Sequence, residues 1–296
     1  MTTRYFQTVF PFELVRAYLG NDAHTVWTQR FQDGNPALLA TNGEWANFGT
    51  LTPGLEHVLK TDELYLSALH CKSETHKKFA IDLDLSDRHI SGCKCTAWED
   101  DGTQRICPKC WSTLLVCASI ICECLENIFN YTSLKFEHEW RPMMLCFSGN
   151  RGMHFYCHPK TGMQTLPENI RTAIVSTLTV NWSKWIRQDL KDYLQGIDFK
   201  SRHPRTALPV DAKASYSHTH NLRCPFSPHI KSRYACTPVL QVASWRDLAS
   251  VNGIENDTPI TIETRGILWH PSECNTAVNT ARVVEAKSVL ANWLAL

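Results

Sequence analysis

The most informative pattern in the chain is the alternation of apolar and acidic residues in FAIDLDLSD, residues 79–87. Successive side chains of a β-strand point to opposite faces, so the apolar residues would face a core. Asp82 and Asp84 would then lie side by side on the other face, where like charges repel each other. The pattern therefore predicts a strand at 79–85 whose acidic face is screened by water or neutralised by a cation.

The other apolar patterns predict a mixture of helices and strands. Long segments with near-helical spacing indicate helices, and two short apolar runs joined by SGNRG indicate paired strands. Residues 28–55, rich in Gly, Asn and Pro, favour loops and strands. Because no regular βαβ rhythm is present, the order of elements favours an α+β fold. The expected elements are an amphipathic helix at 4–19 interrupted at Phe10-Pro11, a buried helix at 111–129, strands at 143–147 and 153–157, one or two helices at 167–195, and a helix at 279–296.

Length and composition narrow the class of protein. The chain has 296 residues, of which 43% are hydrophobic and 20% charged, as is typical of a globular protein. The net charge of +1 provides no overall basic field, so any polyanion site must be a local patch. No apolar run approaches the ~18 residues of a membrane span, and the N-terminus lacks a signal-peptide layout. We therefore expect one intracellular domain over residues 1–296 with no membrane contact, in which the role of 241–296 is open.

The thirteen cysteines fall into two groups. Most lie in apolar segments and are expected to pack in the core as small hydrophobic residues. The others form two close pairs separated by a polar loop, which could supply the four thiolates of a structural zinc site in a lobe at about 90–112. Unpaired loop cysteines or a redox pair are the alternatives, and Cys71 and His89 are the nearest substitute ligands. The predicted zinc ligands are Cys93, Cys95, Cys107 and Cys110.

Two later segments carry groups that suit phosphate. FSGNRGMHFYC places polar side chains around two glycines, which let a backbone approach a ligand closely. DAKASYSHTHNLRCPFSPHIKSR, residues 211–233, adds a third acid and more basic side chains. Taken alone, the first segment is better explained as a hairpin with a solvated arginine, and the second as a solvated basic loop. Together with the acidic strand they supply what phosphoryl transfer from a nucleoside triphosphate needs. The residues concerned are Ser148, Arg151, His154, Asp211, Arg223, His229 and Lys231.

The order of these segments resembles the catalytic small subunit of the archaeo-eukaryotic DNA primases, especially the eukaryotic branch. FAIDLDLSD is similar to the family's first motif, and ICPKCW to its eukaryotic cysteine cluster. FSGNRGMHFYC is similar to the Ser-Gly-x-Arg-Gly-x-His turn, and HNLRCPFSPHIKSR to the third motif. YFQTVFPFELVRAYL is similar to the opening helix, so the resemblance runs from about residue 4 to 240.

The resemblance implies a primase-type catalytic core around a mixed sheet with a zinc-stapled lobe. The implied activity is synthesis of short RNA primers on single-stranded DNA, from nucleoside triphosphates, for DNA replication. The implied partner is a primase large subunit, and the implied location is the nucleus, or the host nucleus for a viral form. The resemblance assigns two Mg²⁺ or Mn²⁺ ions to Asp82, Asp84 and Asp211, the triphosphate to Ser148, Arg151, His154, Arg223 and His229, and one Zn²⁺ to Cys93, Cys95, Cys107 and Cys110.

The sequence departs from the family in several places. Asn150 stands where eukaryotic members usually carry a second basic residue, and Arg223 replaces a usual lysine. The family's arginine on an early strand has no clear match, since Arg30 is a weak candidate. The chain lacks much of the inserted helical region, as a compact viral or divergent form would.

Three rival functions remain at this stage. A DxD strand also serves glycosyltransferases, which need neither Asp211 nor the turn from Ser148 to His154. A zinc-bearing nucleic-acid module without catalysis would not need all three acids. A primase-related extension or repair polymerase would need the same residues as a primase, so the sequence does not separate these two.

Overall fold

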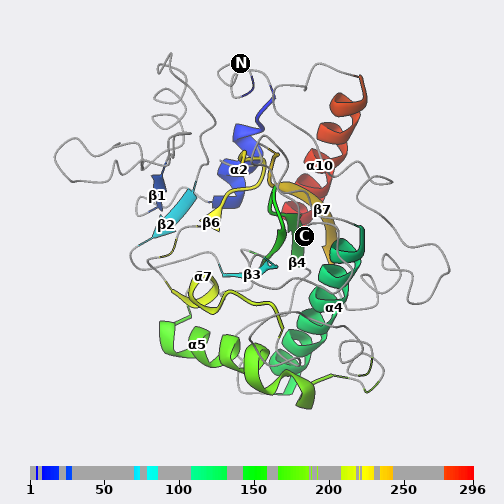
Figure 1. Cartoon of the computed structure of the whole chain (residues 1–296). Coiled ribbons are helices and arrows are strands. Elements are labelled where there is room, and N and C mark those ends of the chain that lie inside the picture. The colour runs from blue at the N-terminus through cyan, green and yellow to red at the C-terminus, as the bar shows by residue number, and fades with distance from the viewer. Residues whose placement is uncertain are drawn as a thin grey trace, which may run out of the picture.

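The computed structural model describes about half of the chain. The described residues are 5, 9–19, 25–28, 70–73, 79–85, 108–131, 143–158, 166–186, 188, 192, 208–217, 220, 222–229, 234–242 and 277–296. The architecture is α+β, with antiparallel strands and helices packed around them (Figure 1). This confirms the α+β class that the sequence predicts, but the described strands pair only antiparallel, and not in the mixed sheet that the resemblance implies.

The centre of the fold is a four-stranded antiparallel sheet of strand order β3-β5-β4-β7. Within it, Asp82 on β3 is paired with His154 on β5, and Asp84 is paired with Gly152. A second, three-stranded sheet has the order β1-β2-β6. The strands are β1 (Thr25–Thr28), β2 (His70–Ser73), β3 (Ala80–Asp84), β4 (Met143–Phe147), β5 (Gly152–Tyr156), β6 (Leu222–Arg223) and β7 (Thr237–Val242).

The two faces of the central sheet bury different side chains. Ile81, Leu83, Leu85 and their neighbours on β4 and β5 pack with helix α4 (Pro108–Tyr131) in one hydrophobic cluster. Ala80 and the alternate residues of β4 and β5 pack with α2 (Phe12–Leu19) and α10 (Ala277–Ala295) in a second cluster. The strand alternation predicted for 79–85 is therefore confirmed, and Asp82 and Asp84 belong to the second face.

Shorter helices lie beside β3. Helix α5 (Glu168–Ser176) continues into a π-helical turn (Thr177–Asn181) and a 3₁₀ turn (Trp182–Lys184), and it contacts α7 (Ala212–Tyr216). Helix α7 in turn contacts β3, so these two helices stand under the acidic strand (Figure 1).

The other elements predicted from the sequence can be compared with the observed ones. The buried helix at 111–129, the helix at 279–296 and the two strands around SGNRG are confirmed, with small shifts at their ends. The N-terminal helix is interrupted as predicted, because a turn at 9–10 precedes α2. Helix α10 contacts β7 and so covers the sheet there, which gives residues 277–295 a structural role that the sequence left open.

One expectation about apolar length was wrong. In the part of the chain that the structure describes, the helical segment Cys110–Phe129 is long and apolar enough to cross a membrane, with a mean hydropathy of 1.6. However, 83% of that window is buried inside the fold. Its composition is explained by its position against the sheet, where Cys117, Cys122 and Cys124 are fully buried as expected.

Candidate active site

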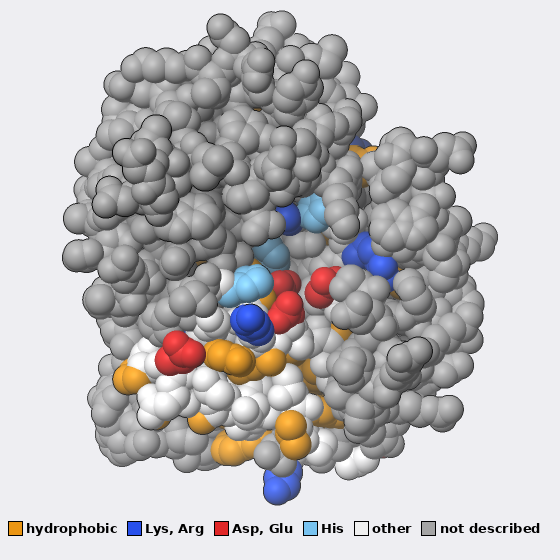
Figure 2. Space-filling model, turned by 60° about the vertical axis from the view of Figure 1, so that its left-hand side comes forward, with side chains coloured by type: hydrophobic (Ala, Val, Ile, Leu, Met, Phe, Trp, Pro, Cys, Tyr) orange, Lys and Arg blue, Asp and Glu red, His pale blue; other side chains and the backbone are white. Residues whose placement is uncertain are grey.

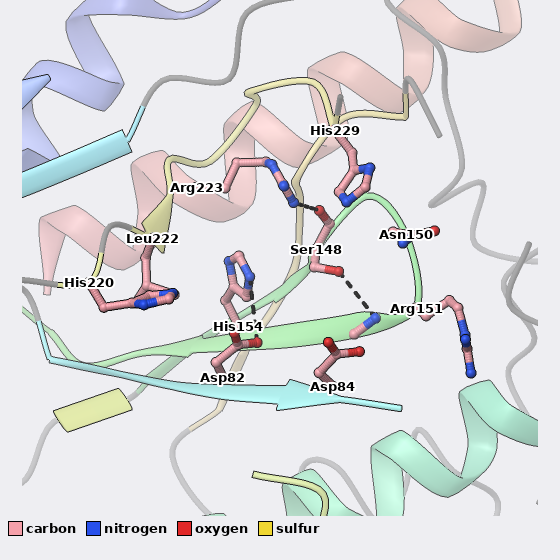
Figure 3. A pocket seen from close by; sticks show the side chains of 11 residues that line it. Asp82, Asp84, Ser148, Asn150, Arg151, His154, His220, Leu222, Arg223 and His229 are labelled. Atoms are coloured by element: carbon pink, nitrogen blue, oxygen red, sulfur yellow. Dashed lines mark hydrogen bonds and ion pairs between the residues drawn. The ribbon is translucent and has the colours of Figure 1, made fainter. Parts of the chain in front are cut away.

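A cavity of about 250 Å³ opens on the second face of the sheet, at the ends of β3 and β5. Figure 2 shows a hollow in which acidic side chains gather next to histidine and basic side chains. Residues from all three predicted motifs meet there (Figure 3). The lining residues are Asp82, Asp84, Ser148, Asn150, Arg151, Gly152, His154, His220, Leu222, Arg223 and His229.

The floor of the cavity is formed by the two acids of β3. The side chain of Asp82 is 19% exposed and lies on the same strand face as Asp84. The pKa of Asp82 is raised from 3.8 to about 6, mainly by burial, which outweighs the attraction of His154; the charges of Asp84 and Asp211 also raise it. A carboxyl group in this situation releases its proton more readily when a cation is present. The carboxylates of the floor therefore repel each other, and a bound cation would reduce that repulsion.

The third predicted acid, Asp211, lies next to Asp82 but outside the cavity lining. Its backbone N–H donates to the carbonyl oxygen of Asp82 over 2.8 Å. Its carboxylate Oδ1 accepts from the N–H of Ala214 over 2.9 Å and so caps α7, which satisfies a donor that a helix start leaves open. Asp211 is solvent-exposed, and its charge is close enough to raise the pKa of Asp82.

The turn between β4 and β5 is held by glycines that no other residue could replace without movement. Gly149 has φ +89°, and a Cβ there would lie 2.5 Å from the carbonyl oxygen of Tyr234. A Cβ on Gly152 would overlap the carbonyl oxygen of Leu83. The hydroxyl of Ser148 accepts from the N–H of Gly152 over 3.1 Å, which closes the turn. The glycines therefore bring this turn against β3 and against the segment that follows Tyr234.

Arg151 lies at the edge of the cavity rather than among its other basic groups. Its Nη2 donates to the carbonyl oxygen of Leu85 over 2.7 Å, and the residue is buried. In Figure 3 the guanidinium points away from Ser148 and toward α4. In this conformation Arg151 ties the turn to the end of β3, and its predicted contact with a triphosphate stays a prediction.

Arg223 and His229 stand on either side of a turn in the third motif. Pro225 and Phe226 form its centre, with the N–H of Ser227 donating to the carbonyl of Cys224 over 3.1 Å. Phe226 has φ 68°, a left-handed conformation that is strained for a bulky residue.

Contacts from distant segments fix that turn and the arginine beside it. The carbonyl of Phe226 accepts from the hydroxyl of Tyr5 over 2.7 Å. Nη1 of Arg223 donates to the carbonyl of Ser148 over 2.6 Å. The third motif is thereby joined to both the N-terminal segment and the glycine turn.

His154 is held in one orientation by Tyr156. The Tyr156 hydroxyl donates its proton to the carbonyl of Arg223, so its oxygen must accept from Nδ1–H of His154, 2.8 Å away. Nε2 of His154 then faces Asp82 Oδ1 at 3.7 Å. Burial lowers the pKa of His154, but the contact with Cys236 and the charge of Asp82 outweigh it, so the pKa lies above 6.5. His154 is therefore suited to carry a proton toward the acids.

Several residues in or beside the cavity were not predicted from the sequence. His220 and Leu222 occupy the end of the cavity opposite Asn150 (Figure 3). His220 could have been suspected from its place in the same run as Arg223. Tyr156 and Cys236 gave no signal, because an aromatic residue and a cysteine in apolar strands are ordinary core residues.

The donor set of this site suits a divalent cation. Carboxylate oxygens are the ligands that Mg²⁺ and Mn²⁺ prefer. Among the described residues, no group of three or more His, Cys, Asp or Glu side chains is placed to hold a metal ion. Mg²⁺ is usually held by one or two carboxylates together with waters and substrate phosphates, so the paired acids and the mutual repulsion at Asp82 fit an open site of that kind.

The predicted zinc site lies largely outside the described residues. Cys93, Cys95 and Cys107 and the substitute His89 all fall there. Cys110 is in the first turn of α4 and is buried, and Cys71 is on β2. Arg30 is also outside the described part. The zinc site therefore stays a prediction.

Comparison with known proteins finds similarity among solved structures. No known protein family and no curated protein sequence matches the chain. Among solved structures, it is similar to the polymerase domain of Mycobacterium tuberculosis Ligase D in complex with DNA. The two share 13% sequence identity with a TM-score of 0.48, over 98% of this chain and 92% of that chain.

Proposed function

We propose that this protein is a nucleotidyltransferase of the primase type, which synthesises short RNA primers on single-stranded DNA. The observation that carries the proposal is that two carboxylates and several side chains suited to binding phosphate line one cavity. Asp82 and Asp84 stand across from Ser148, Arg223 and His229, which lie 66 to 147 residues further along the chain than Asp82 (148 minus 82 and 229 minus 82). The order and spacing of the motifs on the sequence support the same activity.

The two sides of the cavity would divide the work on a bound nucleoside triphosphate. Asp82, Asp84 and Asp211 would hold divalent cations, which when bound would supply positive charge at the attacking 3′-hydroxyl and at the departing pyrophosphate. Arg223 and His229 would neutralise negative charge on the phosphates. Most of the catalysis in such a reaction is positioning and charge stabilisation, which matches a cavity of fixed polar groups.

His154 and the glycine turn would position the triphosphate between these sides. Nε2 of His154 would hold a proton at the acids, because Tyr156 occupies Nδ1. The glycine turn would hold Ser148 and His154 in place, because the carbonyls of Tyr234 and Leu83 pack where side chains at 149 and 152 would lie.

The proposal extends to partners and place of action. A primase holds two nucleotides on a single-stranded template before a primer exists, so we propose a large subunit that shares the initiating site. The template would be single-stranded DNA held through backbone charge and base stacking. The zinc site of Cys93, Cys95, Cys107 and Cys110 and action in the nucleus are part of the same proposal.

The test is template-directed synthesis from single-stranded DNA with labelled ATP and Mn²⁺, with and without a primer. The full chain would be compared with Asp82→Ala, and with Asp192→Asn as the control. Asp192 is an exposed acid outside the cavity, and its carboxylate accepts from Gln188. We expect short products from the wild type and the control, and none from Asp82→Ala.

The outcomes separate the rival functions. Extension of a supplied primer without unprimed synthesis would favour a primase-related extension or repair polymerase, or a primase that needs its large subunit. Unprimed synthesis on adding that subunit would favour the primase. Synthesis by Asp82→Ala would overturn the metal assignment, and no synthesis under any condition would favour the non-catalytic module.

A further inference from the structure

Ser215 lies directly behind the acids and is fully buried. It stands on the inner side of α7, whose first turn begins at Asp211. Its Oγ accepts from the backbone N–H of Asp82 over 3.0 Å. The same hydroxyl donates to the carbonyl oxygen of Asp211 over 2.7 Å. One side chain thus contacts the backbones of two acids that are far apart in the chain.

These contacts complete a set of bonds between β3 and the segment before α7. The N–H of Asp84 donates to the carbonyl of Pro209 over 2.9 Å, and the N–H of Asp211 donates to the carbonyl of Asp82 over 2.8 Å. The Ser215 hydroxyl adds the contact that reaches beyond this short ladder into the helix. A hydroxyl is suited to it because it can donate and accept at once.

Helix α5 supports Ser215 from the other side. Nη2 of Arg171 donates to the carbonyl of Ser215 over 3.4 Å, and the guanidinium lies 5.2 Å from the centre of the Phe79 ring. Arg171 is fully buried, and burial lowers its pKa to about 10. The position of Ser215 is therefore fixed by the core and does not depend on solvent-exposed contacts.

We propose that Ser215 is a positioning residue that sets the distance between Asp82 and Asp211 and thereby shapes the divalent-cation site. The inference rests on the proposed function for the use of that cation, but it concerns binding and can be measured without synthesis. Without the hydroxyl, the start of α7 loses its side-chain link to β3. Asp211 would then sample positions from which it supports the cation less well.

The test is Mn²⁺ binding to the full chain, measured from the loss of the free Mn²⁺ signal in electron paramagnetic resonance, without nucleotide or DNA. Ser215→Ala would be compared with Ser215→Thr, which keeps the hydroxyl. The matched control is Ser119→Ala, because Ser119 is equally buried but donates to the carbonyl of Leu115 within α4. Thermal unfolding of each variant would be recorded in parallel.

We expect Mn²⁺ affinity to fall about 10-fold or more in Ser215→Ala, as is typical when a partner that orients a metal ligand is removed. Ser215→Thr and Ser119→Ala should bind like the wild type. Equal affinity of Ser215→Ala and wild type, equal losses in Ser215→Ala and Ser119→Ala, or no binding to the wild type would each overturn the proposal.

If Ser215→Ala does not fold, another variant still tests the proposal. Ser215→Cys keeps the size but is a weak donor and acceptor, so it should bind Mn²⁺ more weakly than Ser215→Thr if the hydroxyl matters. Equal affinity of these two variants would also overturn the proposal. A wild type that binds Mn²⁺ but synthesises nothing would contradict the proposed function alone.

Discussion

The two sides of the cavity differ in how well neighbouring groups stabilise their side chains. The acid wall, Asp82 and Asp84, carries two carboxylates whose charges repel each other, and burial opposes the ionisation of Asp82. The anion wall, Ser148, Arg223 and His229, is braced by hydrogen bonds such as that from Arg223 to the carbonyl of Ser148. Its backbone is fixed further by the bond from the N–H of His229 to the carbonyl of Tyr234, 2.8 Å long.

This difference indicates which wall a bound ligand would affect more. The anion wall is organised before a ligand arrives, so a triphosphate would meet it with little reordering. The backbone of the acid wall is fixed by β3 and α7, but the charges of its carboxylates still repel each other. A cation would therefore have its main effect on the acid wall, and variants of the two walls should behave differently.

The largest expected effect follows from the raised pKa of Asp82. Between pH 3.8 and about 6 the folded state holds a proton that the unfolded state has released, so the free energy of unfolding falls as pH rises through that window. Above it the full cost remains, up to about 3 kcal/mol at pH 7. Asp82→Asn should remove this cost and make the metal-free protein more stable at pH 7, as measured by urea unfolding.

The cation should reverse that order of stability. Saturating Mn²⁺ should stabilise the wild type, because a ligand bound only by the folded state shifts unfolding, and should stabilise Asp82→Asn much less. Asp192→Asn serves as the control and should follow the wild type in both conditions. A wild type whose stability does not change between pH 4 and 7, or with Mn²⁺, would contradict an acid wall destabilised by burial and charge repulsion.

Next in size is Gly152→Ala, which should damage both walls together. Its Cβ would press on the backbone carbonyl of Leu83, so β3 and the turn would have to separate. Overpacking of this kind costs about 1–3 kcal/mol, and synthesis should fall with it. Urea unfolding and primer extension would measure the two effects. Ser176→Ala, at an exposed helix position, should change neither, and a stable, active Gly152→Ala would show that the walls are not joined there.

Arg223→Lys tests the anion wall alone. The lysine keeps the charge but loses the planar fork of donors, including the bond to the carbonyl of Ser148. Since a hydrogen bond to a charged group contributes about 1.5–3 kcal/mol, KM for the nucleotide should rise about 10-fold or more, with kcat less affected. Steady-state kinetics would measure both constants. Arg282→Lys on α10 is the matched control, and an equal loss in kcat would place Arg223 in the chemical step instead.

The smallest effect is expected for Asn150→Arg, which would add a basic group to the anion wall. Asn150 is half-buried at the cavity rim. Exposed ion pairs contribute about 0.2–1 kcal/mol, so KM for the nucleotide should fall at most about fivefold. The gain should shrink as salt is added, because ions screen such pairs. A KM that rises, or one independent of salt, would indicate that no phosphate reaches this rim.

The sequence predicted the acid wall better than the anion wall, for a physical reason. Alternation along β3 fixes which side chains share a face, so Asp82 and Asp84 could be paired from spacing alone. The direction of Arg151, which points away from the other basic groups, depends by contrast on a bond to the carbonyl of Leu85, which no side-chain pattern records.

Other parts of the site escaped prediction for the same reason. The role of Ser215 depends on backbone groups that approach it from β3, and that of Tyr156 on the carbonyl of Arg223. Apolar helices such as α4 were predicted well, because burial of a whole helix leaves a clear periodic signal. Main-chain partners of single polar side chains leave none.

The bond from the Tyr5 hydroxyl to the carbonyl of Phe226 joins residues 221 positions apart. Strand β7, which completes the sheet beside β4, ends at Val242. Contacts between such distant residues form slowly, because a long loop must close before they contribute. During translation, β3 would leave the ribosome long before its partner strands. Its acids and its apolar face would then be exposed to solvent. We expect the cavity to be among the last parts of the molecule to form, so that an incomplete chain has neither wall in place.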